Sequence, residues 1–267
     1  MNKNCKGTVL ITGASSGIGR ELALIFAQEG YNLVIIARDK KRIKEAEKKI
    51  KKLSSKKVLC ISQDLSDINA PEKIFKKVKS QAGHIDILIN NAGFGWIGDF
   101  ASMDVKTALE MIQVNISALT ALTRLFLTDM LAKNSGKIMN VASTAAFQAG
   151  PYMAVYYATK AYVLSFSQAL NEELKDTNIT VTAFCPGPVE TNFGARAGFS
   201  SKKLFGGLAS MDVKKVAMIG YKGMMRGKPV VVAGFLNWLG TQVIRFLPRS
   251  LPPKFIKRIQ RHRRANG

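Results

Sequence analysis

Ile11-Thr12-Gly13-Ala14-Ser15-Ser16-Gly17-Ile18-Gly19 is the stretch that decides the fold. An apolar run precedes it, and a helical pattern over residues 21–29 follows it. A strand that turns into a helix through glycines gathers backbone N–H groups and the positive end of a helix dipole at one point, which suits a pyrophosphate. The first two glycines permit close backbone approach, and the third permits tight packing of helix on sheet. The spacing G-x-x-x-G-x-G departs from the commonest dinucleotide fingerprint, so a glycine-rich turn without a ligand is an alternative at this point.

Seven short apolar runs alternate with helical patterns along the chain. The runs fall at residues 9–11, 33–37, 58–61, 85–89, 137–141, 179–185 and 230–232. Continuous apolar runs are typical of parallel strands covered on both faces, and the alternation of strand and helix indicates a doubly wound α/β sheet. Ligands of such sheets bind at the carboxyl ends of the strands. The glycine-rich stretch and the polar motifs described below follow such ends.

The composition of the 267 residues limits the classes of protein to consider. With 47% hydrophobic residues, the chain can bury the core of one α/β domain or at most two. Cys5, Cys60 and Cys185 lie far apart, and the two histidines do not share a ligand spacing with them. We therefore expect no metal site and a reduced, cytoplasmic protein. The N-terminus lacks the apolar segment of a signal peptide, so export is not expected.

The net charge of +22 is concentrated in two parts of the chain. Residues 40–57 hold ten lysines and arginines against two glutamates, and residues 213–267 hold thirteen with no acidic residue. Ile43, Ala46 and Ile50 keep a helical spacing within the first segment, which predicts a helix with a solvated basic face. Basic charge without interleaved aromatic residues predicts weak, salt-sensitive attraction to nucleic acid and no specific nucleic-acid partner.

Tyr156 and Lys160 stand four residues apart in a helical pattern, so their side chains share one face. An ammonium group beside a phenol favours the phenolate and lowers the pKa of the phenol from about 10, which suits a group that gives and takes a proton. Ser143 follows the fifth predicted strand, where its hydroxyl can hold the substrate oxygen that Tyr156 protonates. Taken singly, the pair also fits an ordinary surface pair, and Ser143 fits a cap at a strand end.

Six motifs in register resemble those of the short-chain dehydrogenase/reductase family over about residues 7–234. They are Thr12-Gly13-x-x-x-Gly17-Ile18-Gly19, Asn90-Asn91-Ala92-Gly93, Asn115, Ser143, Tyr156-x-x-x-Lys160 and Pro186-Gly187-x-x-x-Thr191. The resemblance implies a single-domain Rossmann-like fold, with a doubly wound, parallel, seven-stranded sheet of order 3-2-1-4-5-6-7 and helices on both faces. It also implies a catalytic tetrad of Asn115, Ser143, Tyr156 and Lys160, in which Asn115 holds a proton-relay water and Lys160 also binds the nicotinamide ribose.

The second predicted strand ends in Ala37-Arg38-Asp39, which bears on the choice of cofactor. Arginine at this position pairs with the 2′-phosphate of NADP(H), whereas an acidic residue binds the 2′-hydroxyl of NAD(H). We therefore predict NADP(H), with Ser15 as a second phosphate contact and Asp39 as the N-cap of the lysine-rich helix. The resemblance places Asp64 at the adenine and Thr191 at the nicotinamide carboxamide. The predicted cofactor-binding residues are Gly13, Ser15, Ser16, Gly17, Ile18, Gly19, Arg38, Asp64, Leu65, Asn91, Ala92, Gly93, Tyr156, Lys160, Pro186, Gly187, Val189 and Thr191.

Residues 192–211 carry apolar side chains among glycines and serines. They include Phe193, Phe199, Leu204, Phe205 and Leu208. A mobile lid over the nicotinamide has this composition, and so does an ordinary surface loop. Because the family uses this region for substrate, we favour the lid and an apolar carbonyl substrate.

The dinucleotide-binding and catalytic domain is expected to span residues 1–234, with a basic amphipathic helical extension over residues 235–267. Phe235, Leu239, Val243 and Phe246 fall on one helical face, and a basic run follows them. This segment is too short and too polar to span a bilayer. One interpretation is a helix that lies on an anionic membrane surface through residues 235–264. The other is that the same face packs on the domain or on a second subunit.

These features predict an NADP(H)-dependent oxidoreductase that transfers hydride between nicotinamide and an apolar or lipid-like ketone, aldehyde or secondary alcohol, for example of the 3-oxoacyl type. The alternative is a non-catalytic nucleotide sensor or interaction protein on the same fold, which the intact Ser143, Tyr156 and Lys160 disfavour. Similar proteins pair through the helices that hold Asn115 and Tyr156, so a homodimer or homotetramer is expected. The expected location is the cytoplasm, and under the membrane interpretation of the extension the protein is peripheral at the inner face of the membrane.

Overall fold

Seven parallel strands form one sheet in this protein, whose computed structural model describes residues 5–189, 193 and 211–265. The order of the strands is β3-β2-β1-β4-β5-β6-β7, which confirms the predicted topology. The sheet is parallel throughout, with Leu10 of the central strand registered against Val34 on one side and Leu88 on the other. The strands are β1 (Thr8–Thr12), β2 (Asn32–Ala37), β3 (Val58–Ser62), β4 (Ile87–Asn90), β5 (Gly136–Val141), β6 (Ile179–Cys185) and β7 (Val230–Val232).

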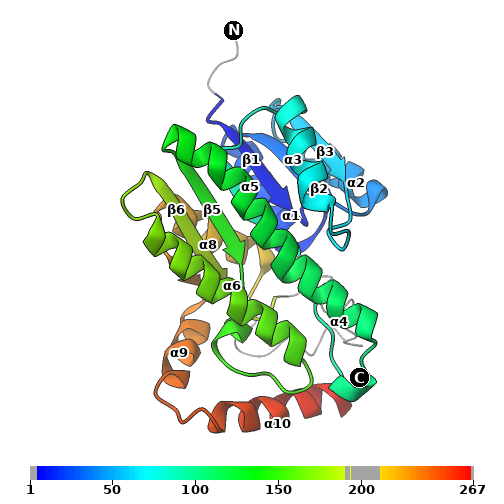
Figure 1. The fold of residues 1–267 in the computed structure, drawn as a ribbon, viewed down its shortest axis with the longest axis vertical. Helices are drawn as coiled ribbons and strands as arrows, with labels where there is room; N and C mark the ends of the chain where they lie inside the picture. The colour runs from blue at the N-terminus through cyan, green and yellow to red at the C-terminus, as the bar shows by residue number, and fades with distance from the viewer. Residues whose placement is uncertain (1–4, 190–192, 194–210, 266–267) are drawn as a thin grey trace.

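Helices cover both faces of the sheet (Figure 1). One face packs against α1 (Gly17–Gln28), α2 (Lys40–Lys51) and α8 (Val213–Met225), the last of which the apolar pattern did not reveal. The other face packs against α3 (Ala70–Gln81), α5 (Ala118–Lys133) and α6 (Ala154–Glu173). Successive strand residues point to opposite faces, so Val9 and Ile11 enter the first core and Leu10 enters the second. Burial on both faces explains why the strands read as continuous apolar runs.

The long helix over residues 105–133 contains a π-helical turn. It comprises α4 (Val105–Ile112), the turn η2 (Gln113–Ser117) and α5. It is long and apolar enough to cross a membrane, but it packs against β4, β5 and α3 as a core helix. A π turn adds one residue to a helical turn and often marks a functional position, and this one holds the buried Asn115.

The C-terminal extension forms two helices, α9 (Phe235–Ile244) and α10 (Leu251–Ala265). Pro252 and Pro253 lie in the first turn of α10, where the missing N–H groups interrupt no helical hydrogen bond. The extension is therefore an angled pair of helices rather than a single one. In Figure 1, α10 runs along the lower edge of the molecule, on the side to which the carboxyl ends of the strands point.

The end of β1 is tied to the end of β4 by the buried Thr12. Its hydroxyl oxygen accepts hydrogen bonds from the backbone N–H groups of Asn91 and Ala92, each at 3.0 Å. In return, the Asn91 amide donates to the backbone carbonyl of Thr12 at 2.9 Å. These bonds hold the glycine-rich turn after β1 against the loop after β4.

Thr12→Val is expected to lower the free energy of unfolding by about 2–4 kcal/mol, because valine has nearly the shape of threonine but leaves two partly buried N–H groups without an acceptor. Urea unfolding followed by circular dichroism measures the change. Thr12→Ser keeps the hydroxyl and removes only a methyl group, so its loss is expected to be about 1 kcal/mol. Equal losses in the two variants would mean that packing, and not the hydroxyl, holds this junction.

Candidate active site

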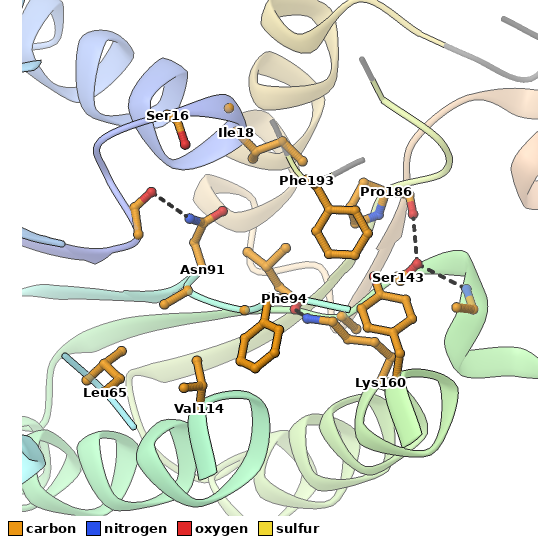
Figure 2. A pocket seen from close by; sticks show the side chains of 18 of the residues that line it. Ser16, Ile18, Leu65, Asn91, Phe94, Val114, Ser143, Lys160, Pro186 and Phe193 are labelled. Atoms are coloured by element: carbon orange, nitrogen blue, oxygen red, sulfur yellow. Dashed lines mark hydrogen bonds between the residues drawn. The ribbon is translucent and has the colours of Figure 1, made fainter. Parts of the chain in front are cut away.

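A cavity of about 540 Å³ opens where the strands end, within the size range of small-molecule sites. Its wall is assembled from segments far apart in the sequence: the turn after β1, the ends of β2 and β3, the loop after β4, the end of β5, α6 and the loop after β6. Figure 2 shows these segments converging, with Ser16 and Ile18 on one side and Ser143 and Lys160 on another.

The glycine-rich turn presents backbone rather than side chains to this cavity. Gly13 and Gly17 have φ angles of 67° and 56°, in the left-handed region that favours glycine. A Cβ on Gly13 would lie 2.8 Å from the Asn91 amide nitrogen, so this turn closes only without a side chain. Helix α1 begins at Gly17, and the Ser16 side chain makes no capping hydrogen bond. The first N–H groups of α1 thus face the cavity rim unsatisfied by a cap, as an anion site requires.

The end of β2 distinguishes the roles of Arg38 and Asp39. The Asp39 carboxylate accepts hydrogen bonds from the N–H groups of Lys41 and Arg42 at 2.9 and 3.0 Å, which confirms it as the N-cap of α2. These backbone bonds lower the pKa of Asp39, the bond from Arg42 having the largest effect. Arg38 is exposed at the cavity wall, with its guanidinium 3.9 Å from the Asp64 carboxylate. Arg38 is therefore the exposed cation at this corner, and the Asp39 carboxylate is engaged by the N-cap of α2.

Ser143, Tyr156 and Lys160 come together at the opposite end of the cavity, as predicted. Ser143 begins the turn η3 (Thr144–Phe147) after β5, and its hydroxyl oxygen accepts the Ala145 N–H at 3.1 Å. The Ser143 hydroxyl also donates to the Pro186 carbonyl at 3.5 Å, and its proximity favours the ionised form of the Tyr156 phenol. The Lys160 ammonium lies 5.8 Å from the centre of the Tyr156 ring. An alcohol, a phenol and an amine thus face one space.

The protonation of this cluster differs from the expectation based on sequence. Desolvation raises the pKa of Tyr156, and the Ser143 hydroxyl only partly opposes it. Lys160 does not lower the pKa of the phenol, because its ammonium donates to the Val141 carbonyl at 2.7 Å instead. Burial lowers the pKa of Lys160 itself to about 8. Tyr156 therefore holds its proton at neutral pH, which is the state that can protonate a carbonyl oxygen.

Asn115, the fourth predicted catalytic residue, lies beside the cavity rather than in its wall. Its amide nitrogen donates to the Phe94 carbonyl and to the Thr159 hydroxyl, both at 3.0 Å. Its oxygen accepts the Phe94 N–H at 3.1 Å. The side chain thus ties the loop after β4 to α6, which positions the cavity wall.

The remaining predicted cofactor residues fall into three groups. Most line the cavity: Gly13, Ser15, Ser16, Gly17, Ile18, Arg38, Asp64, Leu65, Asn91, Ala92, Gly93, Tyr156, Lys160, Pro186, Gly187 and Val189. Gly19 lies behind the turn, where a Cβ would collide with the Asn91 amide. Thr191 and, apart from Phe193 and Met211, the predicted lid over 192–211 lie outside the described residues. Phe193 packs on Tyr156 with 5.3 Å between ring centres.

Gln148 and Gln260 are wall residues that sequence reasoning missed. Gln260 comes from α10, is buried, and donates from its amide nitrogen to the Tyr157 hydroxyl at 3.3 Å. The amide oxygens of Gln260 and Gln148 are both buried without a hydrogen-bond partner among the described residues. The motifs offer no signal for Gln260, because it lies in the extension, more than a hundred residues after Tyr156.

The family model described as short chain dehydrogenase matches residues 7–202. The chain belongs to this family. Among curated relatives of this short-chain dehydrogenase, an NADP-dependent 3-hydroxy acid dehydrogenase from Schizosaccharomyces pombe is 35% identical over 188 residues, covering 70% of this chain and 73% of the relative. These likenesses make the chain an oxidoreductase of the short-chain dehydrogenase family.

Two solved structures are similar throughout the fold of this short-chain dehydrogenase. A short-chain dehydrogenase from Sphingobium yanoikuyae in complex with NADPH is 30% identical, with a TM-score of 0.79 and coverage of 91% of this chain and 97% of the other. A bulky-bulky ketone specific alcohol dehydrogenase from Comamonas testosteroni is also 30% identical, with a TM-score of 0.76 and coverage of 91% and 93%. The coverage extends beyond residue 202, so the likeness includes part of the C-terminal region.

Lys160→Met is expected to abolish turnover and to raise the free energy of unfolding at pH 7 by about 1–3 kcal/mol. The pKa of Lys160 is lower in the folded protein, at about 8, than its ordinary value of 10.5. The unfolded chain therefore binds this proton more tightly, so the buried ammonium destabilises the wild type fully below pH 8. That penalty is relieved as the pH rises from 8 to 10.5.

Urea unfolding at pH 7 and pH 10 checks this prediction, because the advantage of Lys160→Met should shrink at the higher pH. Lys106→Met at an exposed position of α4 is the matched control, with an expected change below about 0.5 kcal/mol at either pH. A Lys160→Met variant less stable than the wild type at pH 7 would show that the Val141 hydrogen bond outweighs the cost of burying the ammonium.

Proposed function

We propose that this protein is an NADP(H)-dependent oxidoreductase that transfers hydride between the nicotinamide and an apolar ketone, aldehyde or secondary alcohol. The observation that carries the proposal is the convergence of Ser143, Tyr156 and Lys160 on one cavity that also includes the glycine-rich turn. A nucleotide sensor needs the turn alone. The three polar groups can carry out general acid–base catalysis, so they favour an enzyme over the non-catalytic alternative.

The bound cofactor supplies or accepts the hydride, while the protein manages the proton. In reduction, Ser143 donates a hydrogen bond to the carbonyl oxygen and Tyr156 transfers its phenolic proton to that oxygen as it becomes an alcohol. In oxidation, the same phenolate takes the proton back from the alcohol. Lys160, held by its hydrogen bond to the Val141 carbonyl, would bind the nicotinamide ribose and keep its ammonium group in the cavity wall. Asn115 contributes through the Phe94 loop that it ties to α6.

The residues at the other end of the cavity fit a dinucleotide. The N–H groups at the start of α1, with Ser16, would hold the pyrophosphate, and the Asp64 and Leu65 region would hold the adenine. Ser15 would be a second contact to the 2′-phosphate. Arg38 would pair with a 2′-phosphate, and the Asp39 carboxylate is occupied by the N-cap of α2. The NADP dependence named for the fission yeast relative and the NADPH in the Sphingobium structure support the same choice.

The substrate end of the cavity favours an apolar carbonyl compound with a hydrogen-bonding group. Met153, Tyr157 and Phe193 supply an apolar wall around Tyr156. The amide oxygens of Gln148 and Gln260, which no described residue engages, can accept hydrogen bonds from a hydroxyl or amide of the substrate. Substrates of the 3-oxoacyl type combine these features, and the names of the two relatives, for 3-hydroxy acids and bulky ketones, fall in this range.

A homodimer or homotetramer in the cytoplasm completes the proposal. Large apolar side chains are exposed along the helices that hold the catalytic groups: Val105 and Leu109 on α4, Leu131 on α5 and Tyr162 on α6. Pairing of these helices between subunits would bury them and would brace the cavity wall from outside.

Tyr156→Phe is expected to lower turnover by about 100-fold to 10,000-fold, because phenylalanine keeps the ring but has no proton to give. NADPH oxidation is measured against ketones and 3-oxoacyl thioesters of graded chain length, and NADPH binding by fluorescence titration should be unchanged. Tyr162→Phe, six residues along the same helix, is the matched control and should retain full turnover. Full activity in Tyr156→Phe would identify another acid, and NADPH binding without turnover by the wild type on every carbonyl would favour the sensor.

Arg38→Gln is expected to raise the KM for NADPH by about 10-fold to 100-fold, since it removes a charge-assisted pair with the 2′-phosphate. The KM for NADH should change by less than about threefold, because NADH lacks that phosphate. Lys40→Gln, exposed at the start of α2, controls for the loss of one positive charge. A wild-type KM lower for NADH than for NADPH contradicts the assignment.

A further inference from the structure

The α9–α10 pair, here called the C-terminal arm (residues 235–265), turns most of its large apolar side chains away from the protein. Nine of the eighteen exposed large hydrophobic residues of the described chain lie in it: Phe235, Leu236, Trp238, Leu239, Val243, Phe246, Leu247, Phe255 and Ile259. Isolated exposed apolar residues are normal, but such a concentration on two helices marks an interaction surface. The apolar face predicted for this segment therefore does not pack on its own domain.

Polar side chains of the arm face inward instead. Thr241 of α9 and Gln260 of α10 are 2% and 1% exposed. Asn237, one turn before Thr241, donates to the Ala233 carbonyl at 2.8 Å and lies against Gly187 in the wall of the cavity. The arm is thus anchored by polar contacts and a few apolar ones, and its amphipathic pattern is directed outward.

The arm also carries positive charge without compensation. Residues 235–267 contain eight lysines and arginines and no acidic residue. Six of the cations are exposed in the described part of the arm: Arg245, Arg249, Lys254, Lys257, Arg258 and Arg261. None of these six forms an ion pair with a described carboxylate. Apolar side chains interspersed with free cations are the composition of a helix that binds an anionic lipid interface.

The junction of the two helices has the most protruding apolar group. Phe246 is 88% exposed, followed by Leu247 at 36%, and both lie between Arg245 and Arg249. In Figure 1 this junction forms the lower left corner of the molecule, between α9 and α10. An apolar tip between two arginines can enter the acyl boundary of a bilayer while the guanidinium groups bind lipid phosphates.

We propose that the C-terminal arm docks this protein on the surface of an anionic phospholipid bilayer. A second copy of the chain is a poorer occupant, because a symmetric contact would bring two clusters of unpaired cations together. A nucleic acid would satisfy the cations but leave the apolar tip in water. An anionic lipid surface matches both the charge and the apolar groups of the arm.

Sedimentation with vesicles tests the proposal with the full-length protein. Binding is expected to vesicles of phosphatidylcholine mixed with phosphatidylglycerol and not to phosphatidylcholine alone. The double variant Phe246→Ser/Leu247→Ser is expected to weaken binding by about tenfold or more, because it removes two apolar groups from the acyl boundary. Ile68→Ser, at a residue 75% exposed outside the arm, is the matched control and should bind like the wild type. Equal weakening by both changes would overturn the proposal.

A second pair of variants separates the arm from the overall positive charge. Arg245→Gln/Arg249→Gln/Lys254→Gln is expected to weaken binding about 100-fold, from a contribution of about fivefold for each cation at the surface. Lys44→Gln/Lys48→Gln/Lys49→Gln removes the same charge from the exposed face of α2 and should weaken it by less than about threefold. Equal effects would assign the binding to net charge and overturn the proposal.

The remaining outcomes also decide the question. If the Phe246→Ser/Leu247→Ser variant has a lower mass than the wild type in sedimentation velocity without lipid, a second copy covers the arm and the proposal is wrong. NADPH oxidation with a water-soluble ketone should be unchanged in every arm variant in the absence of vesicles. Loss of membrane binding would therefore leave the proposed oxidoreductase function intact, and inactivity of the wild-type enzyme would leave the docking result valid.

Discussion

The hydroxyl of Thr12 is the contact on which the site depends most. It holds the end of β1 to the end of β4 by accepting the N–H groups of Asn91 and Ala92. This junction also explains the glycines in a way that differs from the first interpretation. Gly13 and Gly19 lack a Cβ because the Asn91 amide occupies that space, as well as because a ligand needs close approach. Packing against the Asn91 side chain therefore sets the path of the glycine-rich turn. The N–H groups that the turn leaves exposed to the cavity follow from that path.

A second buried polar network sets α6 against the sheet. Asn90 donates to Asn140 and to Thr123, both at 2.9 Å, and Asn140 donates to Ser167 at 3.0 Å. Ser167 lies two turns beyond Lys160 on α6, and Asn140 lies three residues before Ser143. Hydrogen bonds inside a core are directional, so they fix the register of helix and strand more narrowly than apolar packing does. The distance between the Ser143 hydroxyl and the Tyr156 phenol therefore follows from bonds made deeper in the sheet.

The sheet and the position of the site were predictable, because buried parallel strands appear in the sequence as continuous apolar runs. Continuous apolar runs gave all seven strands, and the polar residues that follow them had to meet at one edge. The π turn around Asn115 was not predictable, since one extra residue leaves the apolar pattern of a long helix almost unchanged. Gln260 was not predictable because its place depends on how α10 folds back across the cavity. The hydrogen bond from the Lys160 ammonium to the Val141 carbonyl was not predictable either, because the spacing of residues along the chain does not say which way a long side chain points.

Helix α10 links the cavity to the outer surface, and its two faces obey different constraints. Ile256 and Gln260 face inward, where the packing around Met153 and Tyr157 decides what fits. Phe255 and Ile259 face outward and are 63% and 46% exposed, so packing within the described chain does not account for apolar side chains at these positions. Lysine or glutamate there would cover the same helix at lower risk of aggregation. The apolar character of the outer face therefore has to be explained by contacts outside the chain. The inner face of the same helix forms part of the cavity wall through Gln260. A partner that binds the outer face of α10 therefore contacts the helix that also lines the cavity.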